Sequence, residues 1–156
     1  MKVSILGISC YYHDSSAALV VNGDIISAVQ EERFTRKKND SSFPRMSINF
    51  ILKKNKIKLS EISHIVFYEK PFLKFTRLLE TYLANAPFGF SSFKKALPIW
   101  IKEKLFQKRE IINELKEIDP DFSGKILFSE HHLSHAASAF YPSPFEEALI
   151  ITLDAV

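Results

Sequence analysis

The chain has 156 residues, 46% hydrophobic and 25% charged, which is long and apolar enough to bury a core. Its net charge of +3 gives no general support for nucleic-acid binding, because such proteins usually concentrate far more basic charge. The single cysteine, Cys10, excludes a disulfide within the chain. Polar residues break the apolar start too early for a secretory signal, and no apolar run reaches the roughly 18 residues of a membrane-spanning helix. These features predict a soluble, cytoplasmic protein without a membrane partner.

The beginning of the chain is predicted to form three antiparallel strands. Three short, mostly aliphatic runs are typical of buried strands: residues 3–9, 16–21 and 25–29. Asn22 and Gly23 tolerate the positive φ of a tight hairpin turn, so the second and third strands should pair directly. The polar and basic residues 31–42 are expected to form a loop or the fraying start of a helix.

Helices and strands are then predicted to alternate. The helical patterns cover residues 44–56, 72–84, 92–118 and 131–140. The third of these helices is expected to bend at Pro98. The strand patterns cover residues 62–68, 125–128 and 148–153.

This order of elements, β-β-β-α-β-α-α-β-α, is typical of a ribonuclease-H-like subdomain of the α/β class. Residues 1–141 would form that subdomain. The apolar run at 148–153 is one strand too many, so residues 142–156 are expected to begin a second copy. A bare apolar strand is an aggregation liability, which favours the interpretation that the chain is a fragment or a truncated product.

Three of the five histidines lie within five residues, beginning at His131. On a helix, His131 and His135 are one turn apart, so both rings lie on one face and could bind the same transition metal. His132 points about 100° away. It stands where zinc peptidases carry a glutamate, which disfavours that class. An isolated pair of this kind is more often a helix whose histidines only bond to the backbone.

Asp154 could complete a metal site. It follows the predicted strand 148–153, at the end where sheet proteins often place functional side chains. Two imidazoles and a carboxylate leave coordination positions open and suit Fe²⁺ or another divalent metal. The residue equally fits the plain polar end of a strand.

Two groups near the start of the chain could also carry chemistry. His13 beside Asp14 could move a proton near neutral pH, although Asp and Ser also serve ordinary structural roles in such turns. Further on lies a basic run made of Arg33, Arg36, Lys37 and Lys38. These cations could hold an anionic substrate, but such a run is more often a solvated loop.

The candidate residues lie mainly in two long stretches, HDSSAALVVNGDIISAVQEERFTRKKND..FP and EHHLSHAASAFYPSPFEEALIITLDAV. Both closely resemble the amino-terminal part of the carbamoyltransferase family (NodU/CmcH type). This family includes nodulation proteins and the O-carbamoyltransferases of antibiotic biosynthesis. The resemblance covers nearly the whole chain, although residues 72–118 carry little recognisable pattern.

The resemblance implies an enzyme with an actin-like ATPase fold, made of two ribonuclease-H-like halves and followed by a YrdC-like domain. In such enzymes ATP and carbamoyl phosphate give carbamoyladenylate in the YrdC-like domain. The amino-terminal domain then transfers the carbamoyl group to a hydroxyl of a small-molecule acceptor. The missing carboxy-terminal half and YrdC-like domain would be this chain's partners, and the chain alone is expected to be inactive.

The resemblance also implies roles for individual residues. The family's metal, usually iron, is held by its His-x-x-x-His helix and by aspartates, which correspond to His131, His135 and Asp154. A further aspartate ligand belongs to sequence outside this chain. His13 and Asp14 match the family's amino-terminal His-Asp pair, with His13 as a possible base. No nucleotide-binding residue is assigned, because the four glycines form no phosphate-cradling cluster.

Two other functions stay open at this point. One is a non-catalytic truncated product, or a module that needs its missing half in trans. The other is a tRNA-modifying relative with the same fold, which the modest charge does not favour.

Overall fold

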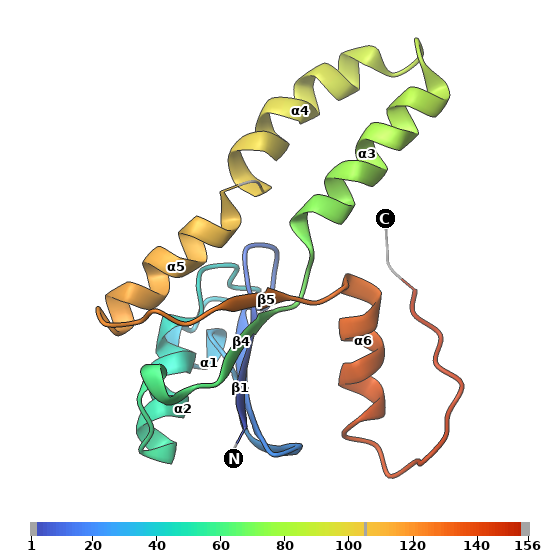
Figure 1. Cartoon of the computed structure of the whole chain (residues 1–156). Coiled ribbons are helices and arrows are strands. Elements are labelled where there is room, and N and C mark those ends of the chain that lie inside the picture. Colours follow the sequence, from blue (N-terminus) through green and yellow to red (C-terminus); the bar gives the residue numbers. More distant parts are fainter. Residues whose placement is uncertain (1–2, 105, 154–156) are drawn as a thin grey trace.

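The strands of the computed structural model, which describes residues 3–104 and 106–153, form one mixed sheet (Figure 1). The strands are β1 (Ser4–Ser9), β2 (Ser16–Val21), β3 (Asp24–Gln30), β4 (His64–Phe67) and β5 (Ile126–Phe128). Their order across the sheet is β3-β2-β1-β4-β5. Neighbours among β1, β2 and β3 are antiparallel, whereas β4 runs parallel to β1 and β5 parallel to β4. The molecule is therefore a mixed α/β structure.

The antiparallel meander predicted for the first thirty residues is confirmed. Asn22 and Gly23 form the turn between β2 and β3 with φ angles of 52° and 96°, the left-handed region that these residue types tolerate. The Asn22 side chain also accepts a hydrogen bond from the backbone N–H of Val3 at 2.9 Å, which ties the turn to the start of β1.

Helices lie on both sides of this sheet. They are α1 (Glu32–Thr35), α2 (Arg45–Asn55), α3 (Pro71–Asn85), α4 (Phe90–Lys104), α5 (Gln107–Ile118) and α6 (His131–Phe140). A short 3-10 turn, Leu59–Glu61, precedes β4. In Figure 1, α2 and α5 lie on one side of the sheet and α6 on the other.

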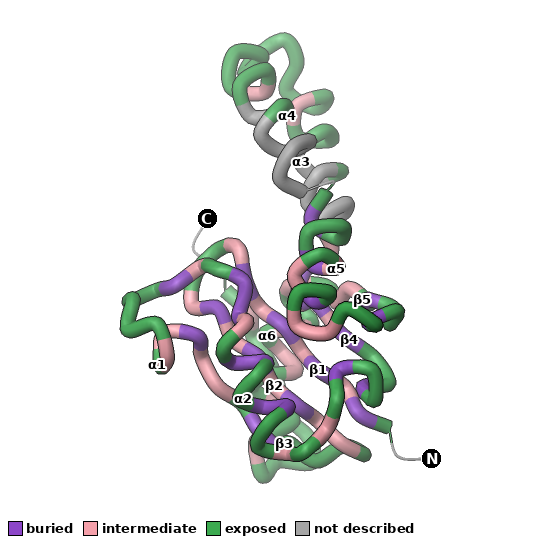
Figure 2. The backbone as a smooth tube through the Cα atoms, turned by 90° about the vertical axis from the view of Figure 1, so that its left-hand side faces the viewer, coloured by how far each residue is buried: buried purple, intermediate pink, exposed green. Residues whose placement is uncertain are grey.

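The core lies between the sheet and the pair α2 and α5. Alternate strand residues point to this side, as the two-residue period of a strand requires. The fully buried strand residues of this core include Leu6, Leu19, Ile65 and Phe67. The helices contribute Ile48, Ile51, Ile111 and Leu115. Along β1 and β2 these buried positions alternate with positions of intermediate burial (Figure 2).

The single helix predicted for residues 92–118 is wrong. The segment forms two helices, α4 and α5, and α4 continues through Pro98. The break falls near Phe106, where α5 begins. The two helices have different partners: α4 lies beside α3 in a hairpin that projects from the sheet (Figure 1), whereas α5 places Ile111 and Leu115 in the core. A break lets each helix meet its own partner.

The strand predicted at 148–153 is also wrong. These residues have no regular secondary structure, and Leu149 and Leu153 are 90% and 89% exposed. An apolar run becomes a strand only where another strand supplies the hydrogen bonds. In Figure 1 this segment runs apart from the sheet, beyond α6, so it meets no such partner.

Within the described residues, the helices are all too short or too polar to cross a membrane.

Candidate active site

One edge of the sheet carries most of the predicted site residues. Ile8 pairs with Phe67 and Phe67 with Phe128, so the parallel strands β1, β4 and β5 end level with one another. The turn 10–15 follows β1, residues 68–70 follow β4, and α6 follows β5. Sheet proteins commonly place functional side chains beyond the carboxyl ends of parallel strands.

The two predicted metal-binding histidines face each other on α6. The Nε2 atoms of His131 and His135 are 3.2 Å apart, and their rings are nearly perpendicular at 86°. The helix therefore places both imidazoles on one face, as the four-residue spacing predicted. This separation allows a hydrogen bond between two neutral rings, and it also places two nitrogen lone pairs where one cation could meet them.

The nitrogen pair fits a divalent transition metal. Metal–nitrogen bonds of about 2.0–2.1 Å would meet at an angle of about 100° across this separation, between the tetrahedral and octahedral values. Among the residues that the structure describes, no group of three or more His, Cys, Asp or Glu side chains could hold an ion. The predicted third ligand, Asp154, lies outside the described residues.

Polar contacts join α6 to the end of β4. The hydroxyl of Ser134 donates a hydrogen bond to the backbone carbonyl of Tyr68 at 2.8 Å. The Lys70 ammonium lies 3.0 Å from the carboxylate of Glu130, the residue before the helix. No residue of α6 is buried. The helix therefore lies on the surface, with its first turn fastened to the segment after β4.

His13 and Asp14 also interact directly. His13 Nδ1 lies 2.7 Å from Asp14 Oδ2, and both side chains reach solvent. The turn that carries them is sharply bent, with Asp14 at a φ of 50°. Backbone bonds from Tyr11 N to Ser41 O (2.9 Å) and from Ser15 N to the next loop fasten the turn on both sides.

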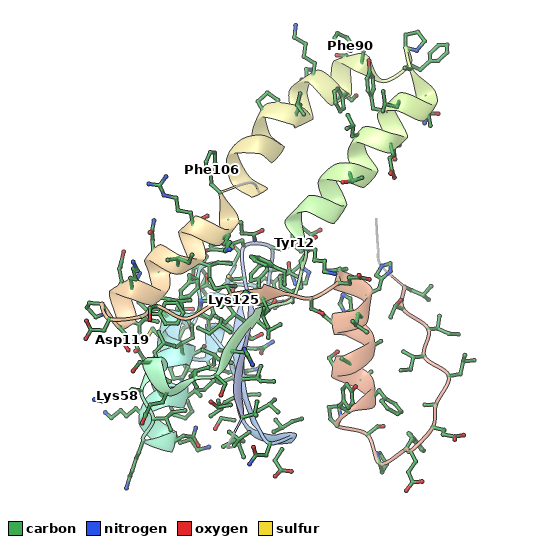
Figure 3. All side chains as sticks on the ribbon, in the orientation of Figure 1. Tyr12, Lys58, Phe90, Phe106, Asp119 and Lys125 are labelled. Atoms are coloured by element: carbon green, nitrogen blue, oxygen red, sulfur yellow. The ribbon has the colours of Figure 1, made fainter. Side chains whose placement is uncertain are left out.

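Tyr68 lies beside the histidine pair on α6. Its ring centroid lies 5.6 Å from that of His131. Burial raises the pKa of its phenol, and the nearby Glu69 carboxylate and Tyr12 phenol add to the rise. Tyr12 in turn lies against His13, with ring centroids 4.8 Å apart. Figure 3 labels Tyr12 near the end of β4 and the start of α3.

Glu31 is a buried residue whose role sequence reasoning missed. Only 2% of it is exposed. Its carboxylate accepts hydrogen bonds from the backbone N–H groups of Met46 (2.9 Å) and Ser47 (2.8 Å) and from the Ser47 hydroxyl (2.6 Å). These donors lie in the first turn of α2, where N–H groups have no partner within the helix. Glu31 thus fixes the start of α2 and the loop that precedes it.

Asp40 organises the other end of the same loop. It accepts bonds from the backbone N–H of Ser42 at 3.0 Å and from the Ser42 hydroxyl at 2.8 Å. These bonds, helped by Thr35 and Lys37, lower the Asp40 pKa to about 2. The backbone carbonyl of Asp40 accepts the bond from Ser15 N at 2.8 Å, so this aspartate lies next to the His13 turn.

The basic residues are all exposed: Arg33 lies in α1, and Arg36, Lys37 and Lys38 lie in the loop that follows this helix. Arg33 lies 3.7 Å from Glu32, and Lys37 lies 3.9 Å from Asp40. Because the loop bonds to the turn 10–15, these cations lie on the side of the sheet edge where His13 stands.

Of the two buried acids Glu31 and Asp40, only Asp40 lies in a sequence pattern that indicates its hydrogen bonds. Asp40-Ser-Ser42 has the pattern of a turn in which an aspartate side chain bonds to the backbone two residues on. Glu31 gave no comparable signal, because its partners lie 15 and 16 residues away in the chain.

Comparison with known proteins shows the family to which the chain belongs. The sequence model of the family described as "Carbamoyltransferase N-terminus" matches residues 4–156. The uncharacterized protein sll1178 of Synechocystis sp. is 56% identical over 155 residues, covering 97% of this chain and 25% of that protein. Nodulation protein NolNO of Sinorhizobium fredii is 36% identical over 145 residues, covering 92% of this chain and 20% of that protein.

An archaeal relative has a similar degree of likeness. The uncharacterized protein MJ1051 of Methanocaldococcus jannaschii is 33% identical over 150 residues, covering 96% of this chain and 22% of that protein. The chain thus spans between a fifth and a quarter of the length of these three relatives. Since the family match covers almost all of its residues, the chain belongs to the carbamoyltransferase family and corresponds to the family's amino-terminal part.

Proposed function

We propose that the chain is the amino-terminal part of an O-carbamoyltransferase that transfers a carbamoyl group to a hydroxyl of a small-molecule acceptor. Membership of the family supports the reaction class. The observation that carries the site assignment is the facing pair His131 and His135, with Nε2 atoms 3.2 Å apart at the sheet edge that also holds His13. The full reaction would draw on ATP and carbamoyl phosphate through carbamoyladenylate.

The fold part of the proposal is a ribonuclease-H-like subdomain of the actin-like ATPase type, formed by residues 1–141. Its support is the strand order β3-β2-β1-β4-β5, in which three antiparallel strands are followed by two parallel ones. Each parallel strand is reached through helices, as crossover connections require.

His13 is the general base of the proposed reaction. Its Nδ1 lies 2.7 Å from the Asp14 carboxylate, so this nitrogen carries the ring proton and donates a hydrogen bond to Asp14. Nε2 is then the nitrogen with a lone pair, and it accepts the proton of the acceptor hydroxyl as that oxygen attacks the carbamoyl carbon. The bond from the carbamoyl carbon to the phosphate oxygen of carbamoyladenylate breaks, and AMP leaves with the bonding electrons.

The basic run supplies positive charge for the phosphate of the donor. Arg36 and Lys38 are exposed on the loop whose backbone bonds to the turn of His13. Arginine can bind two phosphate oxygens at once, and lysine acts as a point charge. Both would stabilise the negative charge that grows on the leaving phosphate.

His131, His135 and Asp154 are the proposed ligands of a divalent metal such as Fe²⁺. When bound, this ion would supply Lewis-acid stabilisation of phosphate charge. The imidazole separation fits such an ion, and the proposal for Asp154 rests on the family resemblance.

Metal binding by the 156-residue chain tests the site. We expect Fe²⁺ or Co²⁺, titrated without oxygen, to bind the unsubstituted chain and to bind His131→Ala and His135→Ala far more weakly. Loss of a ligand should exceed the about 10–100-fold loss typical for groups that only support a ligand. The matched control is His64→Ala, because His64 is an exposed histidine at the opposite end of β4. Equal metal content in all four proteins would contradict the assignment.

A further inference from the structure

We propose that Tyr68 is a positioning residue of the imidazole pair: its ring holds the orientation of His131, and its backbone carbonyl holds the helix that carries both histidines. This inference rests on the metal site proposed above. Tyr68 directly follows β4 and is not one of the predicted metal ligands.

The first observation is the contact between the two rings. The centroids of Tyr68 and His131 are 5.6 Å apart, with the ring planes tilted by 55°. An imidazole rotates easily about its last side-chain bond, because that torsion has broad minima. A neighbouring aromatic ring limits this rotation. The orientation matters because the His131 and His135 rings meet at 86° with their Nε2 atoms 3.2 Å apart.

The second observation is a hydrogen bond to the backbone carbonyl of Tyr68. Ser134 lies between the two histidines in sequence, and its hydroxyl donates to the Tyr68 carbonyl at 2.8 Å. The ion pair of Lys70 and Glu130, at 3.0 Å, adds a contact one residue before the helix. The side chain and the carbonyl of Tyr68 therefore contact the same turn of α6.

The third observation is how little of α6 is buried. None of its residues is buried, and Leu133, the apolar residue between the histidines, is 60% exposed. Tyr68, by contrast, is firmly placed: its N–H bonds to the Ile8 carbonyl at 3.3 Å, and its ring lies 4.9 Å from that of Phe67. A well-fixed ring thus supports a lightly fixed helix.

The contacts with α6 described above are made by the aromatic ring and the backbone carbonyl of Tyr68, so the roles of the ring and of the hydroxyl can be tested separately. Phenylalanine at this position keeps the aromatic face against His131, whereas leucine removes it. Groups that support a metal ligand typically cost about 10–100-fold in metal affinity when they are lost. We therefore expect Tyr68→Leu to lower Co²⁺ affinity by about that factor and Tyr68→Phe to stay close to the unsubstituted chain.

Co²⁺ is the probe, because its visible absorption reports the geometry of its ligands as well as its binding. The experiment titrates Co²⁺ into the unsubstituted 156-residue chain, Tyr68→Leu, Tyr68→Phe and a control, Tyr141→Leu. Tyr141 is an exposed tyrosine that directly follows the same helix. We expect a weaker and altered cobalt spectrum for Tyr68→Leu, with the phenylalanine variant and the control unchanged.

Unchanged affinity and spectrum in Tyr68→Leu would overturn the inference while the metal site itself stands. Should circular dichroism show that this variant is unfolded, Ser134→Ala takes its place, because it removes only the hydroxyl that binds the Tyr68 carbonyl. Weaker Co²⁺ binding by folded Ser134→Ala supports the inference, and unchanged binding overturns it. If the unsubstituted chain does not bind Co²⁺, the proposed site and this inference fail together.

Discussion

The two sides of the sheet are covered in very different ways. On one side, α2 and α5 bury Ile48, Ile51 and Leu115 completely. On the other side α6 buries none of its residues, and Leu133 is 60% exposed. The apolar contacts that stabilise the fold are therefore concentrated on the α2 and α5 side.

The difference separates stability from the candidate site. The predicted metal ligands on α6 can be substituted without opening the core. The helix that carries these histidines is held by polar and ring contacts with the segment after β4. The variants below test this separation, beginning with the one expected to have the largest effect.

Removing apolar side-chain volume should lower the free energy of unfolding only on the α2 and α5 side of the sheet. Ile48 is 0% exposed, so Ile48→Ala leaves a cavity in the core. We expect it to lower the free energy of unfolding by about 2–5 kcal/mol. Leu133→Ala, on the exposed α6, should change this free energy by no more than about 0.5 kcal/mol. Urea unfolding followed by circular dichroism measures both.

Similar losses in the two variants would show that α6 is packed as firmly as α2. Such a result would remove the distinction between a stabilising and a site-bearing side of the sheet. A loss in Ile48→Ala alone would sharpen it.

The start of α2 depends on one buried acid. Glu31→Gln replaces one of the two carboxylate oxygens that accept bonds from Met46 and Ser47 by an NH2 group, which can only donate. Hydrogen bonds to a charged group each contribute about 1.5–3 kcal/mol, so we expect an unfolding free energy lower by about 2 kcal/mol. The measurement is again urea unfolding, with Glu147→Gln in the exposed tail as control.

A loss no greater than that of the control would mean that the buried carboxylate of Glu31 does not stabilise α2. The helix would then depend on the packing of its apolar face alone.

Local patterns predicted much of this structure. The hairpin turn at Asn22 and Gly23 was predictable because both residues tolerate positive φ, and α2 and α6 were found from helical periodicity. The facing of His131 and His135 followed from their spacing, since a helix places residues four apart on one face. Each of these features depends on residues close in the chain.

Features that depend on distant residues were not predictable. The contact of Ser134 with Tyr68 spans 66 residues, and the bonds from Glu31 to α2 span 15 and 16. The apolar run 148–153 has a strand pattern, but a pattern does not supply the neighbouring strand that it needs. The role of Asp154 stays a prediction.

The smallest expected effect concerns the loop between the core and the His13 turn, and it depends on pH. Hydrogen bonds from Ser42 lower the pKa of Asp40 from 3.8 to about 2. Well above the unfolded pKa of 3.8 the carboxylate is charged in both the folded and the unfolded chain, and its stabilising contribution is complete. Between about pH 4 and pH 2 the unfolded chain takes up the proton first, so this contribution falls as the pH falls. Asp40→Asn should therefore be less stable than the unsubstituted chain at pH 7, and the difference should shrink toward pH 2.

Urea midpoints at pH 7, 4 and 2.5 measure this difference in stability, with Asp24→Asn at the exposed start of β3 as control. A difference that stays constant across this range would contradict the link between Asp40 ionisation and the loop, and the His13 turn would then owe its position to backbone bonds alone.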